Sequence, residues 1–168
     1  MKLNTKRIAI CGVIAAVYAA VTISTAAFAY GPIQFRIAEA LCVLPFFLPY
    51  TTWGLFAGCL IANIFSTVSA LDIIIGSMAT LIGCLWTSKV KKAYLAPLPT
   101  VICNWLMVGA MLAYVYTPDA FLSGFITMGL QVAVGEGAVM GLLGLPLTFY
   151  LDKTGLCRRL DAIKPKNS

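Results

Sequence analysis

The side chains able to do chemistry in this sequence are few, and they interrupt a chain that is otherwise almost entirely apolar. The amide and ionisable residues that stand out are Gln34, Arg36, Glu39, Asn63, Asp72, Asn104 and Glu136. An ion in the hydrocarbon of a bilayer costs about 2.5–3.5 kcal/mol on insertion scales, so such residues lie at an interface, in a pair or in a cavity. Glu136 has no evident nucleophile or metal ligand beside it, no pair of cysteines has a metal-ligand spacing, and the chain has no histidine. The chemistry they predict is recognition of a small polar solute, with no metal bound.

Arg36 and Glu39 lie three positions apart in the string YGPIQFRIAEALCVLPFFLP, which runs from Tyr30 to Pro49. This spacing brings two side chains together on a helix, so one interpretation is a simple ion pair at a helix mouth. The alternative is that both residues belong to a solute site. The sequence alone leaves both open.

Composition determines the class of protein. The 168 residues are 61% hydrophobic and 11% charged, too few polar residues to cover a soluble globule. We expect a single all-α integral membrane domain over residues 1–168. The net charge of +6 comes from short basic clusters between apolar runs, which indicate membrane orientation and contact with lipid headgroups and not nucleic-acid binding. The six cysteines are scattered and are expected to be reduced.

Six membrane spans give the most consistent topology. We expect them near residues 8–29, 40–50, 53–67, 72–86, 100–116 and 121–151. With both termini in the cytoplasm, eleven of the twelve basic residues fall on the inner side and only Arg36 falls outside. Such a bias is the positive-inside signal. A cleaved signal peptide ending at Ala27-Phe28-Ala29 is a rival, but the apolar run is longer than a signal core.

This topology places Gln34, Arg36, Glu39 and Asp72 at the outer face and Asn63 toward it. Counting from Pro99 places Asn104 nearer the cytoplasm, where it would bridge helices or bind solute. The last apolar run is longer than the hydrocarbon is thick, so we expect a break or bend near Gly124 or Gly129.

Small residues repeat four apart along the first helix, a pattern that allows close helix approach in lipid. The stripes are Gly12, Ala16 and Ala20, with Ala15 and Ala19 beside them. They predict either packing within the chain or docking of a partner helix.

The chain contains no phosphate-binding G-x-x-x-x-G-K-[ST] loop, so any ATP must be hydrolysed by another protein. Three functions remain open. The chain could be the binding subunit of an ATP-driven importer, a self-sufficient channel or secondary transporter, or a membrane enzyme.

Several strings together resemble the QueT family, whose members are predicted queuosine-precursor transporters. They are YGPIQFRIAEALCVLPFF, GLFAGCLIANIFS, GSMATL after Asp72, LAPLP before Asn104, and VGEG before GLPL. The resemblance covers nearly the whole chain in the family's order. It implies a six-helix S component of an energy-coupling factor (ECF) transporter in a prokaryotic-type plasma membrane. Such a protein is non-catalytic and contains no cofactor. It works with a transmembrane coupling subunit and two cytosolic ATPases, which bind ATP and Mg²⁺.

The resemblance also implies roles for individual residues. The ligand is expected to be a queuosine precursor or queuine, a 7-substituted 7-deazaguanine; another vitamin-like solute is the alternative. An A-x-x-x-A face of the first helix, here Ala15/Ala19 or Ala16/Ala20, is expected to dock on the coupling subunit. Tyr30 and Trp105 are candidates to stack on the ring, although aromatic residues at span ends are often interfacial anchors.

Glu136 is the residue expected to recognise the deazaguanine ring. Its two oxygens can accept hydrogen bonds from the ring N–H and the exocyclic amino group of a deazaguanine. The flanking Gly135 and Gly137 leave room for a flat ring. Arg36 and Gln34 reach Glu136 only if the outer segment folds inward, whereas Glu39 and Asp72 are expected near the surface, available to an aminomethyl cation. The alternative is that Glu136 only bonds a neighbouring helix.

Overall fold

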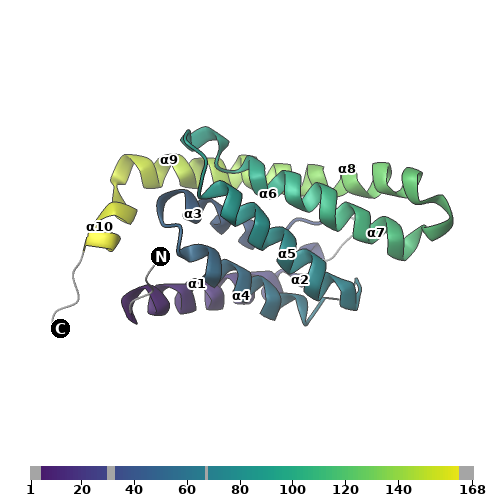
Figure 1. Cartoon of the computed structure of the whole chain (residues 1–168), viewed down its shortest axis with the longest axis horizontal. Helices are drawn as coiled ribbons and strands as arrows, with labels where there is room; N and C mark the ends of the chain where they lie inside the picture. Colours follow the sequence, from purple (N-terminus) through teal and green to yellow (C-terminus); the bar gives the residue numbers. More distant parts are fainter. Residues whose placement is uncertain (1–4, 30–32, 67, 163–168) are drawn as a thin grey trace.

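The computed structural model is an elongated helical bundle, which confirms that the fold is all-α (Figure 1). It describes residues 5–29, 33–66 and 68–162, apart from the side chains of Arg158 and Asp161. Tyr30, which was predicted to contact the solute, lies outside the described residues. Among those described, four helical stretches are long and apolar enough to cross a membrane: Thr5–Ser24, Ala70–Thr87, Ala93–Tyr116 and Pro118–Thr154. The chain is therefore a multi-pass membrane protein.

The first half of the bundle is built from α1 (Thr5–Ser24), the short α2 (Ala26–Ala29), α4 (Thr51–Asn63) and α5 (Ala70–Thr87). Between them run the 3₁₀ helix η1 (Ile37–Val43) and α3 (Leu44–Phe47). Helix α1 packs on α4, and α4 packs on α5. Glycines in α4 make this possible: a Cβ placed on Gly54 would lie 2.5 Å from the carbonyl oxygen of Cys11, and one on Gly58 would lie 2.7 Å from that of Ala15. Small residues at such contacts let helix backbones approach closely in lipid.

The second half consists of two long helical stretches with irregular turns inside them. The first comprises η2 (Ala93–Leu95), α6 (Leu98–Cys103), the π-helical η3 (Asn104–Val108) and α7 (Gly109–Tyr116). After η4 (Pro118–Ala120), the second comprises α8 (Phe121–Val139), the π-helical η5 (Met140–Gly144) and α9 (Leu145–Thr154), and α10 (Leu156–Ala162) follows. Pro146, near the start of α9, has no backbone N–H to donate, which accounts for the widened turn before it.

The predicted break near Gly124 or Gly129 is wrong, because α8 continues through both glycines. They serve close packing instead. A Cβ on Gly109 of α7 would lie 2.7 Å from the Cα of Gly129, and Gly124 lies against the Thr117 hydroxyl. A glycine inside a membrane helix is tolerated where a neighbouring helix fills the space, and here α7 does so.

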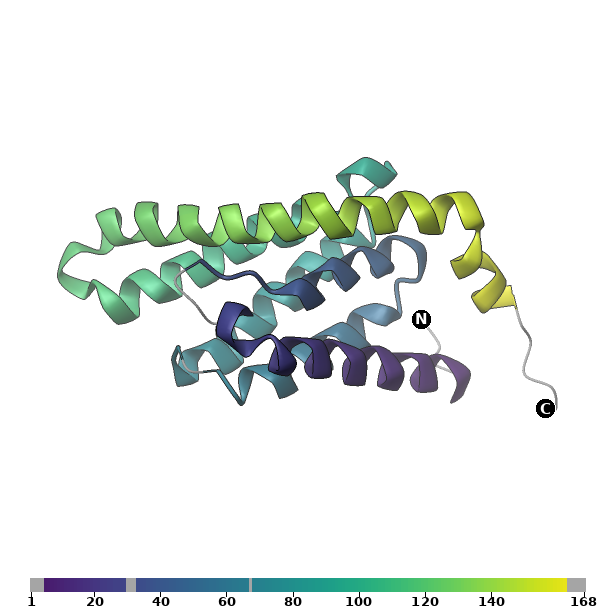
Figure 2. The same ribbon diagram turned by 180° about the vertical axis from the view of Figure 1, so that it is seen from behind.

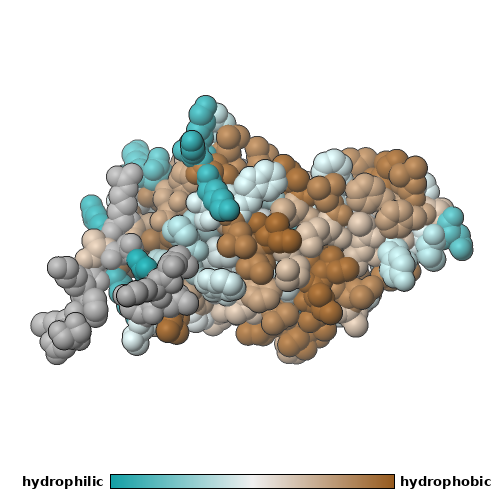
Figure 3. Space-filling view, in the orientation of Figure 1, coloured by the Kyte–Doolittle hydropathy of each residue, from teal (hydrophilic) through white to brown (hydrophobic). Residues whose placement is uncertain are grey.

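The element η1 occupies the centre of the bundle. It contacts α1, α4, α5, α8, η5 and α9, and Figure 2 shows it with α3 between α1 and the α8–α9 stretch. The beginning of α1 meets α10, where the Lys6 Nζ donates to the carbonyl oxygen of Leu160. The turns between α4 and α5 and between α7 and α8 lie at the opposite end (Figure 1). Hydrophobic side chains cover the middle of the face in Figure 3, and hydrophilic ones gather toward its ends.

Candidate functional site

Arg36 is the centre of a buried ion cluster at the junction of η1, α4 and α5. Its Nη2 donates to Asn63 Oδ1 over 2.5 Å and to Asp72 Oδ2 over 3.3 Å, and its Nη1 lies 4.0 Å from Glu39 Oε1. These side chains are at most 1% exposed. Arg36 therefore pairs with Glu39, as its spacing indicated, and also with a carboxylate 36 positions away.

Asn63 and Asp72 hold the α4–α5 turn around the guanidinium. The Asn63 amide donates to the Asp72 carbonyl oxygen over 2.9 Å and to the Ser77 hydroxyl over 3.3 Å. Ser69 caps α5 by accepting a hydrogen bond from the Leu71 N–H, so Asp72 stands in the first turn, where the helix dipole favours negative charge. A Cβ on Gly76 would lie 2.5 Å from Asp72 Oδ1, so only glycine leaves room for this carboxylate.

Glu39 is fixed from several sides. The Tyr18 hydroxyl donates to Glu39 Oε1 over 2.5 Å, the Thr80 hydroxyl to the same oxygen over 3.3 Å, and the Cys42 thiol to Oε2 over 3.0 Å. With Arg36 on the remaining side, Glu39 is fully buried and its oxygens are occupied. Its surroundings are those of a structural carboxylate that positions Arg36.

Asn104 and Glu136 form a second buried polar pair, between η3 and α8. The Asn104 Nδ2 donates to Glu136 Oε1 over 2.9 Å, and each side chain is 1% exposed. Asn104 thus bridges helices, one of the two roles expected for it. Asn104 Oδ1 and Glu136 Oε2 are shielded from solvent and have no hydrogen-bond partner among the described residues.

The segment that precedes η1 folds into the bundle. Gln34 is 2% exposed, and its backbone lies so close to Gly135 that a Cβ there would overlap the Gln34 carbonyl oxygen. The Phe35 N–H donates to the carbonyl oxygen of Phe28 over 3.0 Å, which ties the segment to α2. The inward fold required to bring Gln34 and Arg36 toward Glu136 is therefore present.

The prediction that Glu39 and Asp72 lie near the surface is wrong. Both are 0% exposed, because the inward segment carries Arg36 into the bundle and the carboxylates gather around it. Trp105 is separate from both clusters: its indole ring lies over Gly129, and the side chain is 37% exposed.

Tyr18, Thr80, Ser77 and Cys42 belong to the ion cluster but were not singled out from the sequence. A signal for Thr80 was available. Asp72, Gly76 and Thr80 are spaced four apart, so small or polar residues follow one face of an otherwise apolar α5. Such a face in a membrane helix indicates the bundle interior.

The two small-residue stripes of α1 have different surroundings. Ala15 and Ala19 are buried beside α4, whereas Ala16 and Ala20 are exposed. Gly12 joins the exposed stripe, since a Cβ on it would meet nothing within 4 Å. Packing within the chain therefore accounts for Ala15 and Ala19, and docking of a partner stays a prediction for Ala16 and Ala20.

Comparison with known proteins identifies the relatives of this bundle. A family model described as QueT transporter matches residues 8–153. The chain belongs to the QueT transporter family. A queuosine precursor transporter, QueT, of Lactococcus lactis subsp. cremoris (strain MG1363) is 33% identical over 99 residues. That match covers 55% of this chain and 58% of the relative, less than two thirds of its length. No solved structure matches the chain.

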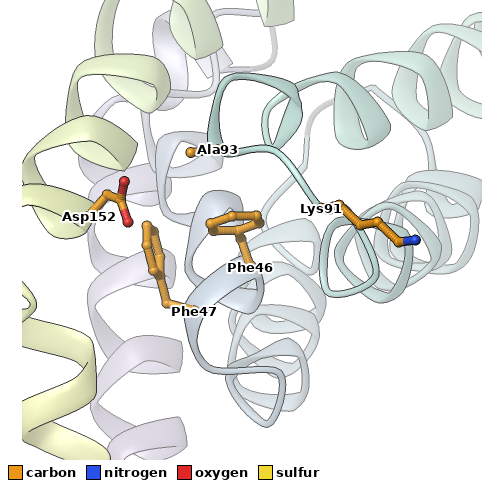
Figure 4. A pocket seen from close by; sticks show the side chains of 5 residues that line it. All are labelled: Phe46, Phe47, Lys91, Ala93 and Asp152. Atoms are coloured by element: carbon orange, nitrogen blue, oxygen red, sulfur yellow. The ribbon is translucent and has the colours of Figure 1, made fainter.

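The part of the chain that matches the QueT family includes all the residues of both buried clusters. A pocket of about 410 Å³ is also present, at the end of the bundle that holds α10. Phe46 and Phe47 pack edge to face at its centre, with Asp152 and Lys91 on opposite sides (Figure 4). Its lining shares no residue with either cluster, so we do not assign the solute to it.

Proposed function

We propose that this chain is the substrate-binding S component of an ECF-type importer and that it binds a queuosine precursor or queuine, a 7-substituted 7-deazaguanine. Family membership and the name of the 33% identical relative support the solute class. The absence of a phosphate-binding loop from the sequence supports an energy source on other subunits, namely two cytosolic ATPases that bind ATP and Mg²⁺.

The main support for the proposal is that one carboxylate oxygen of Glu136 has no hydrogen-bond partner among the described residues. A buried polar atom without a partner is costly, and native structures keep few of them. Glu136 Oε2 is such an atom, in a helix that is apolar around it. A ligand that donates hydrogen bonds would satisfy it, and the ring N–H of a deazaguanine is such a donor.

The charges of the two clusters favour a solute with a positive group. Among the described residues, three buried carboxylates (Glu39, Asp72 and Glu136) accompany one buried guanidinium, that of Arg36. Carboxylates that lack a counter-charge are expensive in apolar surroundings. Asp72 Oδ1 also has no hydrogen-bond partner in the described part of the chain, so it is available to a protonated aminomethyl group on the precursor.

The proposed orientation has six passes with both termini in the cytoplasm. Eleven of the twelve basic residues of the sequence then fall on the cytoplasmic side, which in the described part of the chain is the end where α1 begins and α10 ends. Residues of the α4–α5 turn, Asn63 and Asp72, lie at the outer end, so the ion cluster faces the side from which solute arrives. All of its side chains are buried, so entry of a solute requires a segment to move, and we propose the segment that contains Gln34, whose backbone lies against Gly135.

The exposed stripe of Gly12, Ala16 and Ala20 is the proposed docking face for the transmembrane coupling subunit. Its residues are small and exposed, and a Cβ on Gly12 would meet nothing within 4 Å, so a partner helix can approach the α1 backbone closely. A bulky residue there separates the two backbones without touching the polar clusters.

Reconstitution into liposomes tests the importer-subunit proposal. The purified chain alone should bind a radiolabelled 7-deazaguanine and release it unchanged, without concentrating it. Uptake into liposomes should require the coupling subunit, the ATPases and ATP. Accumulation by the chain alone would contradict the proposal and make it a stand-alone transporter, and chemical conversion of the ligand would make it an enzyme.

Two glycines beside Glu136 provide a matched pair of variants for the site itself. Gly135→Ala places a Cβ against the Gln34 carbonyl and should displace the inward segment, which lowers ligand affinity. Gly137→Ala meets nothing within 4 Å and should bind like wild type. Equal affinities of the two variants would show that the ligand does not depend on the Gln34 segment.

A further inference from the structure

The hydrogen bond between Asn104 and Glu136 determines which of their atoms are left for a ligand. Glu136 Oε1 accepts this bond from Asn104 Nδ2. Because the amide turns its NH₂ group to the carboxylate, its carbonyl oxygen is the atom that remains. Asn104 Oδ1 and Glu136 Oε2 are thus two acceptors on neighbouring residues of different helices, and both lack partners among the described residues.

Gln34 adds a third atom of the opposite kind. Its Nε2 is a donor shielded from solvent, and it too has no partner within the described part of the chain. The Gln34 backbone lies against Gly135, the residue that precedes Glu136. Three segments of the chain therefore contribute two acceptors and one donor, each at most 2% exposed.

This set complements one type of heterocycle. A guanine-type edge carries a ring N–H and an exocyclic amino group, which are two donors, beside a carbonyl oxygen, which is an acceptor. An adenine-type edge offers an amino donor beside a ring nitrogen that accepts, and a hypoxanthine-type edge lacks the amino group. Buried polar atoms in a binding site reject ligands that leave them unpaired, which makes such a set selective.

We propose that Asn104 is a specificity-determining residue whose Oδ1 accepts a hydrogen bond from the exocyclic amino group of the ring. Glu136 Oε2 accepts from the ring N–H, and Gln34 Nε2 donates to the ring carbonyl. This inference rests on the proposed function and changes one part of the sequence-based expectation. Glu136 Oε1 already accepts a hydrogen bond from Asn104, so the proposal assigns the ring N–H to Oε2, the oxygen without a partner in the described part of the chain, and the amino group to Asn104.

A purely structural role for the pair is the competing explanation. It accounts for the hydrogen bond between η3 and α8 but leaves two acceptors and one donor buried without partners. One segment lies against Gly135 and another bonds to Glu136, and three such atoms on these segments and on Glu136 are better explained by a ligand that satisfies them together.

A ligand pair tests the assignment. Dissociation constants are measured by isothermal titration calorimetry for 7-deazaguanine and for 7-deazahypoxanthine, which differs only in lacking the amino group. Wild type should bind 7-deazaguanine about tenfold or more tightly than 7-deazahypoxanthine, the scale of one hydrogen bond to a buried partner. In Asn104→Leu the ratio should fall to about twofold or less. The control Gln131→Leu removes an exposed amide from α8 and should keep the wild-type ratio.

The outcomes separate this inference from the proposed function. Wild type that binds neither ring overturns the proposed function and the inference with it. Wild type that binds both rings equally, or an Asn104→Leu ratio equal to that of wild type, overturns the inference and leaves the proposed function standing. Should Asn104→Leu not fold, Asn104→Ala also removes the acceptor at this position and is measured in the same way, with the same ratio deciding.

Discussion

Replacing Glu136 by glutamine separates the binding role of this residue from its structural role. The Gln side chain keeps its shape, and its carbonyl oxygen can still accept the 2.9 Å hydrogen bond from Asn104. The change falls on the other oxygen, Oε2, which has no partner in the described protein and becomes an NH₂ group. A neutral amide is cheaper to bury than a carboxylate, so Glu136→Gln should unfold at the same temperature as wild type or higher.

Ligand affinity should move in the opposite direction. An NH₂ group at this position faces the ring N–H donor with another donor, and a hydrogen bond to a charged acceptor is lost. That loss is about 1.5–3 kcal/mol, or about 10- to 150-fold in dissociation constant. Isothermal titration of a 7-deazaguanine gives the affinity, and thermal unfolding in detergent gives the stability. Asp119→Asn, which neutralises an exposed carboxylate at the α7–α8 turn, is the control and should change neither. Wild-type affinity in a folded Glu136→Gln protein would refute the reasoning.

Other substitutions test the packing and the ion cluster. Arg36→Met leaves two buried carboxylates without their counter-ion, so the free energy of unfolding should fall by about 3–5 kcal/mol. A variant with the thermal stability of wild type would contradict a stabilising role for the ion cluster. Gly54→Ala should destabilise the α1–α4 contact whereas Gly12→Ala should not, and equal melting temperatures would show that the close contact is unimportant. Ala16→Trp should block co-purification with the coupling subunit while ligand binding survives, whereas Ala15→Trp should prevent folding. Co-purification of the Ala16→Trp variant with the coupling subunit would contradict the proposed docking face.

Much of the fold was predictable because apolar runs of membrane length have few alternatives. The expected spans near residues 72–86 and 121–151 correspond closely to α5 and to α8 through α9. The short second run, expected near residues 40–50, contains Pro45 and Pro49 and forms only the end of η1 and the short α3. The number of spans and their orientation stay predictions, since they depend on where the membrane lies.

The errors have a common cause, which is that the sequence does not show which helices are neighbours. Gly124 and Gly129 indicate flexibility when α8 is considered alone, but with α7 beside it they are contact points. Ala15 and Ala16 are indistinguishable by type, yet only α4 determines which of them is buried.

The candidate site was predicted in its residues and only partly in its arrangement. The amides and ions at positions 34, 36, 39, 63, 72, 104 and 136 are all buried. They divide into an ion cluster around Arg36 and a pair at Glu136, because carboxylates at 39 and 72 gather on the one guanidinium that the inward segment supplies. That gathering depends on a long-range contact, which residue spacing cannot show.

Native mass spectrometry of the purified chain after incubation with 7-aminomethyl-7-deazaguanine tests the central claim most directly. We expect one ligand bound per chain, and it should be retained in the absence of any ATPase or coupling subunit. An excess of 7-deazaguanine, which has a different mass, should displace it. Loss of the bound species in Glu136→Gln at the same ligand concentration would locate it at the proposed site. A chain that stays free of this ligand at saturating concentration, or that retains a different solute which a deazaguanine does not displace, would contradict the account.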